Sequence, residues 1–249
     1  MKSSVPVILV AVAFALALPA GSAAQDPPKE PPPPPRFEGT ADFSFVSTTG
    51  NTSTQSIGLA GDTMYRPNGW EIRNKAAFVR AKTGDDLSAQ SIVYLFRAAR
   101  KITARLSGYG QFDYTRDRFA GIEHRNAALG GLEYRLLETA PHDLKLFGGV
   151  GYVNEQRLTG EDVSTGAVDA GWAYTLKVSE TADLTDDFRW GASFDESSDW
   201  RVNHVAALTT RVHSILSLKV SHTTRYVNFP PPGFEKTDTI TSVALVAKF

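Results

Sequence analysis

From residue 37 onward, apolar and polar positions alternate with a period of two, which is the pattern of β-strands that have two unlike faces. The last thirteen residues, 237–249, show this pattern clearly. One alternate set ends in Val243, Leu245 and Phe249, whereas the other includes Asp238. The ends of soluble proteins fray, but the last strand of an outer-membrane barrel closes the sheet and carries interface aromatics. The pattern therefore favours a membrane barrel closed by its C-terminal strand.

Twelve segments of this kind follow one another, separated by turn-forming residues such as Pro67-Asn68-Gly69. Each segment is long enough to cross a bilayer as a tilted strand, which takes about 9–11 residues. The predicted strands are residues 37–47, 54–66, 70–82, 88–99, 102–115, 122–136, 143–155, 166–178, 183–194, 200–212, 215–227 and 237–249.

A sheet that spans a membrane must close on itself, because backbone polar groups cannot stay unpaired in hydrocarbon. The strand count is even, and residues 116–121, 156–165 and 228–236 are long polar connections, whereas most alternate connections are tight. We therefore predict an all-β fold, a 12-stranded antiparallel transmembrane β-barrel of the outer-membrane type, spanning residues 37–249. The alternative is a soluble barrel or sandwich, which would turn its apolar face inward.

Aromatic residues favour the membrane barrel, because they gather at strand ends on the apolar face, where the girdles of such barrels lie. The residues predicted to form the inner girdle or the assembly signal are Phe37, Trp70, Tyr134, Val243, Leu245 and Phe249. Tyr65 joins the inner girdle, and the predicted outer girdle comprises Phe45, Phe78, Tyr114, Tyr152, Phe194, Trp200 and Tyr226.

A few polar residues also fall on the apolar face, namely Asn74, Asn126, Asp186 and His222. Asp186 is near a predicted strand start, where the membrane interface tolerates a charge. Asn74 is nearer the middle of its strand, so we expect either a register shift of one residue or a β-bulge there.

Residues 1–24 have the form of a secretory signal peptide, with Lys2 before an apolar run and small residues at Ser22 and Ala24. We expect cleavage before Gln25, and the absence of cysteine at that position excludes a lipoprotein. Residues 25–36 contain seven prolines and predict an extended polyproline II spacer in the periplasm, with a docking strut as the alternative. The expected location is the outer membrane of a Gram-negative bacterium.

Composition excludes some functions. The chain has no cysteine, so disulfides and thiolate metal sites are impossible. Without Lys2, which belongs to the predicted signal peptide, 25 basic residues face 27 acidic ones, so nothing predicts nucleic-acid binding.

The polar face of the strands carries charges of both signs. We interpret these charges as cross-strand pairs that fill a water-containing lumen, and the alternative is a narrow pore with a weak preference for anions. Twelve strands lie between the filled small barrels and the open porins of 16–18 strands. The candidate lumen-lining residues are Arg73, Lys75, Arg97, Arg105, Asp113, Arg125, Glu133, Arg135, Arg189, Arg211, Lys219, Arg225 and Asp238.

Catalytic and metal motifs are not evident in the sequence. The chain has five histidines but no Gly-x-Ser-x-Gly elbow, so an outer-membrane hydrolase is a minor alternative. Acidic pairs such as Asp85-Asp86 lack the spacing of an EF-hand loop. We therefore predict no catalytic residue, no metal ligand and no cofactor.

Several short motifs, taken together, resemble a known family. They are Thr49-Gly-Asn-Thr52, Asp117-Arg-Phe-Ala-Gly-Ile122, Gly131-Leu-Glu-Tyr-Arg-Leu136, Gly149-Val-Gly-Tyr152 and Pro231-Pro-Gly-Phe-Glu-Lys-Thr-Asp-Thr239. The combination is similar to the salt-induced outer-membrane proteins of the family called domain of unknown function 481 (DUF481), over about residues 37–249. The resemblance implies an outer-membrane β-barrel. It implies no activity and assigns no functional residue.

These observations predict a narrow channel or an envelope-structural protein, and the name of the family that the chain resembles implies a stress-related role. The alternatives are a surface-binding module that acts through the outer loops and, less favoured, the hydrolase. The expected partners are outer-membrane lipids, lipopolysaccharide and the barrel-assembly machinery, which would act on the C-terminal strand. The sequence does not predict the oligomeric state.

Overall fold

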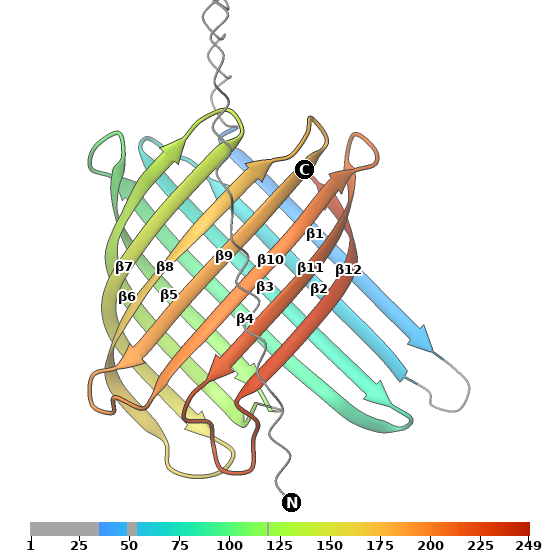
Figure 1. The fold of residues 1–249 in the computed structure, drawn as a ribbon, viewed down its shortest axis with the longest axis vertical. Helices are drawn as coiled ribbons and strands as arrows, with labels where there is room; N and C mark the ends of the chain where they lie inside the picture. The colour runs from blue at the N-terminus through green and yellow to red at the C-terminus, as the bar shows by residue number, and fades with distance from the viewer. Residues whose placement is uncertain (1–34, 49–53, 119) are drawn as a thin grey trace, which may run out of the picture. The chain divides into compact units, whose positions relative to one another are not determined.

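The computed structural model describes residues 35–48, 54–118 and 120–249, which form a closed antiparallel barrel of twelve strands (Figure 1). The predicted fold class is therefore confirmed, whereas the predicted signal peptide and residues 25–34 of the predicted spacer lie outside the described residues. Among the described residues, no helix is long and apolar enough to cross a membrane. The strands are β1 (Phe37–Thr48), β2 (Thr54–Tyr65), β3 (Trp70–Thr83), β4 (Asp86–Lys101), β5 (Leu106–Asp117), β6 (Ile122–Glu138), β7 (His142–Arg157), β8 (Val163–Lys177), β9 (Ala182–Ser193), β10 (Trp200–Arg211), β11 (Leu216–Val227) and β12 (Thr237–Lys248).

The apolar face of the sheet points outward and the polar face points into the barrel. Phe43 and Leu59 are about half exposed on the outside, whereas Gln111 and Asp169 are buried inside. A soluble barrel would show the reverse arrangement, because water would then contact the apolar face. The predicted girdle and assembly residues all lie exposed on the outer face: Phe37, Trp70, Tyr134, Val243, Leu245 and Phe249.

Polar residues on the outer face keep to a regular register and bond to one another. Strands β2 and β3 pair without interruption past Asn74, so the register shift or bulge expected there is wrong. Instead, the Asn74 side chain accepts a hydrogen bond from the Tyr94 hydroxyl at 2.9 Å. His222 similarly bonds to Thr241 at 2.8 Å. The register shifts that do occur lie near the strand ends, for example between Ala81 and Lys82.

At the end of the barrel that carries Phe249, the connections are short, and we call this end the short-turn rim (top of Figure 1). One of these turns corrects the sequence interpretation. Residues 102–105 form a tight turn in which the Ile102 and Thr103 amides both donate to the Leu106 carbonyl, so β5 begins at Leu106 and not at residue 102. Arg105 therefore lies exposed in this turn and not on the strand.

The opposite end, the long-loop rim, carries loops that pack against each other. The Thr159 hydroxyl donates to the Pro232 carbonyl at 2.7 Å, and the Leu158 amide donates to the Gly121 carbonyl at 2.9 Å. Gly121 has a φ of +77°, and a Cβ there would lie 2.7 Å from the Phe234 ring. We call Gly121, residues 158–162 and residues 228–236 the loop cap. Loops that follow β5, β7 and β11 thus contact one another although their strands are not neighbours.

The seam between β1 and β12 is the shortest strand pairing in the barrel. It has four paired positions, from Thr40–Lys248 to Phe43–Leu245, whereas β1 pairs with β2 at twelve and β11 with β12 at eleven. Beyond these positions the Gly39 and Phe249 backbones exchange two hydrogen bonds, at 2.9 and 3.0 Å. Toward the long-loop rim the two strands diverge (Figure 1). Among the described residues, Thr237–Ala244 of β12 therefore have a strand partner on the β11 side alone.

Candidate functional site

The lumen is the candidate site, because inward alternation gathers the charged side chains there. Two ion pairs connect strands on opposite walls, six places apart in the ring of twelve. Lys75 on β3 lies 3.7 Å from Asp187 on β9, and Arg225 on β11 lies 3.0 Å from Asp117 on β5. We call these the transverse ion pairs. Opposite walls therefore come close enough for their side chains to meet, and the lumen is crossed at two levels.

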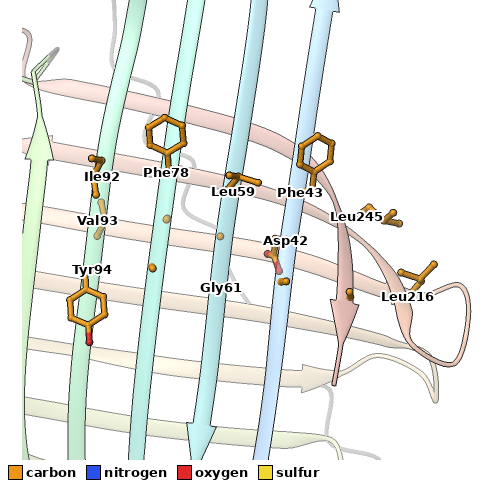
Figure 2. Close-up of a pocket in the computed structure, with 15 residues that line it drawn as sticks. Asp42, Phe43, Leu59, Gly61, Phe78, Ile92, Val93, Tyr94, Leu216 and Leu245 are labelled. Carbon is orange, nitrogen blue, oxygen red and sulfur yellow. The ribbon is translucent and has the colours of Figure 1, made fainter.

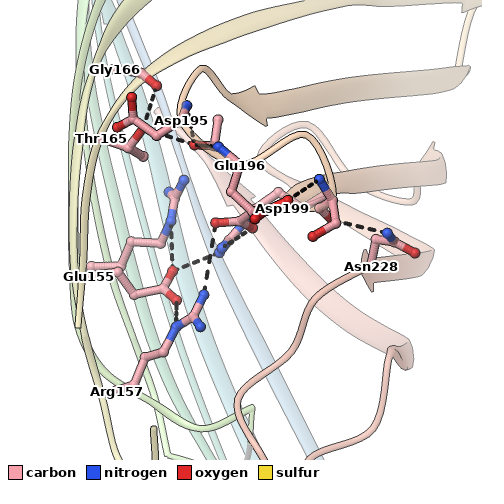
Figure 3. Close-up of polar contacts among 12 residues, drawn as sticks. Glu155, Arg157, Thr165, Gly166, Asp195, Glu196, Asp199 and Asn228 are labelled. Carbon is pink, nitrogen blue, oxygen red and sulfur yellow. Dashed lines mark hydrogen bonds and ion pairs between the residues drawn. The ribbon is translucent and has the colours of Figure 1, made fainter. Parts of the chain in front are cut away.

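Near the long-loop rim, three arginines converge on one buried carboxylate (Figure 3). Glu155 on β7 is fully buried and lies 2.8 Å from Arg157, 2.8 Å from Arg201 and 3.1 Å from Arg125. Asp199 also contacts Arg201, at 3.2 Å. A carboxylate out of contact with water is tolerated only when cations and hydrogen bonds replace its hydration. We call these five residues the Glu155 cluster.

Other ion-pair networks line further parts of the lumen. Arg189 on β9 bridges Asp113 on β5, at 2.8 Å, and Asp169 on β8, at 3.1 Å. Nearer the short-turn rim, Lys145 contacts both Glu133 and Glu71, at 3.3 and 3.2 Å. These pairs link walls that are one to four strands apart, so the inner surface is a connected lattice of opposite charges.

A cavity of about 290 Å³ remains in the half of the lumen toward the long-loop rim. Its wall combines charged side chains, such as Arg225 and Asp238, with apolar ones, such as Leu129 and Val153. The apolar part continues into a buried cluster of Ala127, Leu129, Val153 and Ala167. The lumen cavity thus has mixed polarity.

The structure places the sequence-predicted lumen residues in different surroundings. Arg73 bonds to Asp62, and Arg97 to Glu133 at 2.7 Å. Those that take part in ion pairs on the strands are Arg73, Lys75, Arg97, Asp113, Arg125, Glu133, Arg135, Arg189, Lys219 and Arg225.

The other three predicted residues lie outside these ion pairs. Arg105 is in the β4–β5 turn, and Arg211 is exposed at the short-turn rim, where it donates to the Glu180 carbonyl at 2.9 Å. Asp238 lines the lumen cavity, and within the described residues it has no ion-pair partner.

Sequence reasoning missed the centre of the Glu155 cluster. Glu155 and Arg201 have the inward parity of their strands, so the period of two could have identified them. Arg157 falls in the predicted loop over residues 156–165, whereas β7 extends two residues beyond its predicted end and includes it. Asp199 lies in the loop before β10 and carries no periodic signal.

One histidine–carboxylate pair lies on the outer face. His204 is 2.7 Å from Asp186, which also accepts from the Trp172 indole at 2.7 Å. A hydrolytic site would need a nucleophile within hydrogen-bond reach of the histidine. Among the described residues, no serine or threonine hydroxyl bonds to His204, and no group of three acidic or histidine side chains could hold a metal ion.

The outer face also has an apolar depression of about 580 Å³ over β1–β4 and β12 (Figure 2). Small residues such as Gly61 and Ala76 lie along it, between the larger side chains of Phe43, Phe78 and Leu245. Phe43 and Leu245 are the last paired residues of the β1–β12 seam. The depression therefore reaches the position where the seam pairing stops.

Solved structures that match the chain include an outer-membrane channel and an autotransporter translocator domain. An outer-membrane channel from Pseudomonas putida F1 is 11% identical, covers 91% of this chain and 100% of its own, and superposes with a TM-score of 0.51. The translocator domain of the autotransporter NalP from Neisseria meningitidis is 12% identical, with 86% of both chains covered and a TM-score of 0.44. At these identities the likeness concerns the fold alone.

No curated protein matches the chain. The family model described as "Protein of unknown function, DUF481" matches residues 41–249, which include every strand except the first four residues of β1. The chain therefore belongs to the DUF481 family.

Proposed function

We propose that this protein is an outer-membrane channel for small ions and solutes whose narrow lumen is gated by ion pairs. The proposal rests on the two transverse ion pairs, Lys75–Asp187 and Arg225–Asp117. A closed barrel with an apolar exterior belongs in a bilayer. A lumen lined by charged groups can hold water, and the ion pairs that cross it restrict what passes.

Gating follows from the energetics of the Lys75–Asp187 pair, the more exposed of the two. Each side chain of the Lys75–Asp187 pair is between a third and a half exposed, so solvent screens the pair. Partly exposed pairs contribute only about 0–1 kcal/mol. Such contacts can break transiently without unfolding the wall. The buried Glu155 cluster is expected to remain fixed, because separating its charges would leave them without partners.

Planar-bilayer recordings of the purified protein test the proposal. The wild type should show small conductance steps above the empty bilayer. The double variant Lys75→Ala/Asp187→Ala removes one transverse pair and should give larger steps, since two bulky side chains leave the lumen. The matched control is Arg66→Ala/Glu38→Ala, which removes an ion pair at the short-turn rim and should conduct like the wild type. The proposal is wrong if neither the wild type nor the transverse-pair variant conducts.

The loop cap supports a second candidate, a surface-binding function. Its loops are held by the Thr159–Pro232 hydrogen bond and by the Phe234 contact with Gly121, so they present one ordered surface. We propose lipopolysaccharide as the partner of this surface. Replacing residues 158–162 by a glycine-serine loop of equal length should then weaken binding of purified protein to lipopolysaccharide. Unchanged binding would argue against this function.

A further inference from the structure

We infer that the β1–β12 seam is a lateral route by which an uncharged molecule of low polarity moves between the lumen cavity and the membrane. This inference goes beyond axial conduction of ions, because it concerns the wall of the barrel and not its axis.

The first observation is the early end of the seam. Pairing stops at Phe43–Leu245, and the backbones of β1 and β12 diverge from there to the long-loop rim (Figure 1). Unpaired backbone groups are costly in hydrocarbon. Among the described residues, the edge of β12 from Thr237 to Ala244 nevertheless lacks a β1 partner. Water or a passing molecule would supply the hydrogen bonds that this edge lacks.

The second observation is the polarity of the wall beside the opening. Outer-face positions of a membrane barrel are normally apolar, and Val243 and Leu245 follow that rule. Toward the long-loop rim, however, the outer face of β12 carries Thr239 and Thr241, and Thr241 bonds to His222. Hydroxyl and imidazole groups at this height can bond to water at the exposed strand edge. The outer face of β12 is thus more polar beside its unpaired edge than beside its paired positions.

The third observation is that apolar space exists on both sides of the seam. Inside, the lumen cavity of about 290 Å³ reaches Asp238 on β12 and is partly lined by Leu129 and Val153. Outside, the depression of about 580 Å³ begins at Phe43 and Leu245, where pairing stops (Figure 2). The lumen cavity, at about 290 Å³, is at the lower end of the range for small-molecule sites.

The fourth observation is that packed loops and ion pairs lie along the axial route on either side of the cavity. The loop cap lies at the long-loop rim, and within it Pro231 is buried and Phe234 contacts Gly121. On the other side, Arg189 bridges Asp113 and Asp169 across the lumen. The charged groups on the cavity wall are mostly paired with each other, so they offer little to a charged ligand. An uncharged, largely apolar molecule fits this environment. The seam leads to the membrane interior, where such a molecule is most soluble.

Two double-cysteine variants test the inference, since the native chain has no cysteine. Ser44→Cys/Ala244→Cys places thiols at the first positions beyond the last paired residues, Phe43 and Leu245. The control is Ser221→Cys/Ser242→Cys, which places them on the paired strands β11 and β12. Spin labels on the first variant should be farther apart than those on the control. Equal separations would mean that the seam is closed and would overturn the inference.

The same variants test passage. Cells that produce each variant are treated with a short bis-maleimide, and uptake of the uncharged fluorescent probe N-phenyl-1-naphthylamine is followed. Cross-linking the first variant should reduce the uptake rate to that of cells without the protein, whereas cross-linking the control should leave it unchanged. If both variants keep the wild-type rate, the inference is wrong. Bilayer conductance is measured separately, so a failure of ion conduction would not be mistaken for a failure of the lateral route.

Discussion

Replacing Glu155 by glutamine should strongly destabilise the barrel, because the substitution keeps the shape of the side chain and removes its charge. Glu155 is fully buried and is the shared partner of Arg125, Arg157 and Arg201. With Asp199 included, the Glu155 cluster has three positive and two negative charges. The substitution raises its net charge from +1 to +2.

The expected magnitude follows from the geometry. The nitrogens of Arg125 and Arg201 contact the same Glu155 oxygen, at 3.1 and 2.8 Å, so they lie no more than about 6 Å apart. Two unit charges at about 6 Å repel by roughly 3 kcal/mol at an effective dielectric constant of about 20, and without the Glu155 carboxylate this repulsion is no longer offset. Removing one member of a buried ion pair typically costs about 3–5 kcal/mol. We therefore expect Glu155→Gln to lower the free energy of unfolding by about 3–5 kcal/mol.

Urea unfolding of the protein in lipid vesicles, followed by tryptophan fluorescence and by heat-modifiable gel mobility, measures this change. Glu161→Gln is the matched control, since Glu161 is exposed in the β7–β8 loop, and it should change stability by less than about 0.5 kcal/mol. Adding Arg125→Gln to Glu155→Gln removes one repelling charge and should recover part of the loss, as expected for coupled neighbours. A Glu155→Gln variant within about 1 kcal/mol of the wild type would refute this account of the cluster.

Three further predictions concern the seam, the loop cap and the outer face. Deleting Phe249 removes two backbone hydrogen bonds from the short seam, each of which contributes about 0.5–1.5 kcal/mol to stability. Less folded, heat-modifiable protein should therefore reach the outer membrane, and normal amounts would contradict the role of the seam. Gly121→Ala should speed protease cleavage of the loop cap more than Gly84→Ala does. Both glycines have a positive φ, but of the two only Gly121 has other atoms where a Cβ would lie. Equal cleavage would show that backbone strain alone matters. His204→Leu should lower the urea midpoint, because the Asp186 carboxylate on the outer face then keeps only its hydrogen bond from Trp172. Adding Asp186→Leu should restore the midpoint, and no recovery would rule out the Asp186 charge as the cause.

The strands could be predicted closely from the sequence, because a two-faced sheet requires a period of two in every segment. The predicted strand over residues 200–212 corresponds to β10, which ends at Arg211. The clearest error was the start of β5. Ile102 and Ala104 continue the alternation of that strand, but a chain reversal needs a few residues, and the backbone uses residues 102–105 for the turn.

The partners of the lumen charges could not be predicted. Alternation indicates that Lys75 points inward, but it does not indicate that Asp187, six strands away, is close to it. That distance depends on how closely opposite walls approach. The sequence does not predict the short seam either. Strand β12 alternates without interruption from Thr237 to Lys248, whereas its pairing with β1 ends at Leu245.

The transverse ion pairs also bear on how slowly the barrel comes apart. Neighbouring strands can pair while the sheet is still open, but β3 can contact β9, and β5 can contact β11, only after the sheet has curled. Contacts that form after the folding transition state slow unfolding and leave the folding rate nearly unchanged. Lys75–Asp187 and Arg225–Asp117 therefore contribute to the lifetime of the folded state. For a protein that must persist in the membrane after insertion, this rate governs its durability.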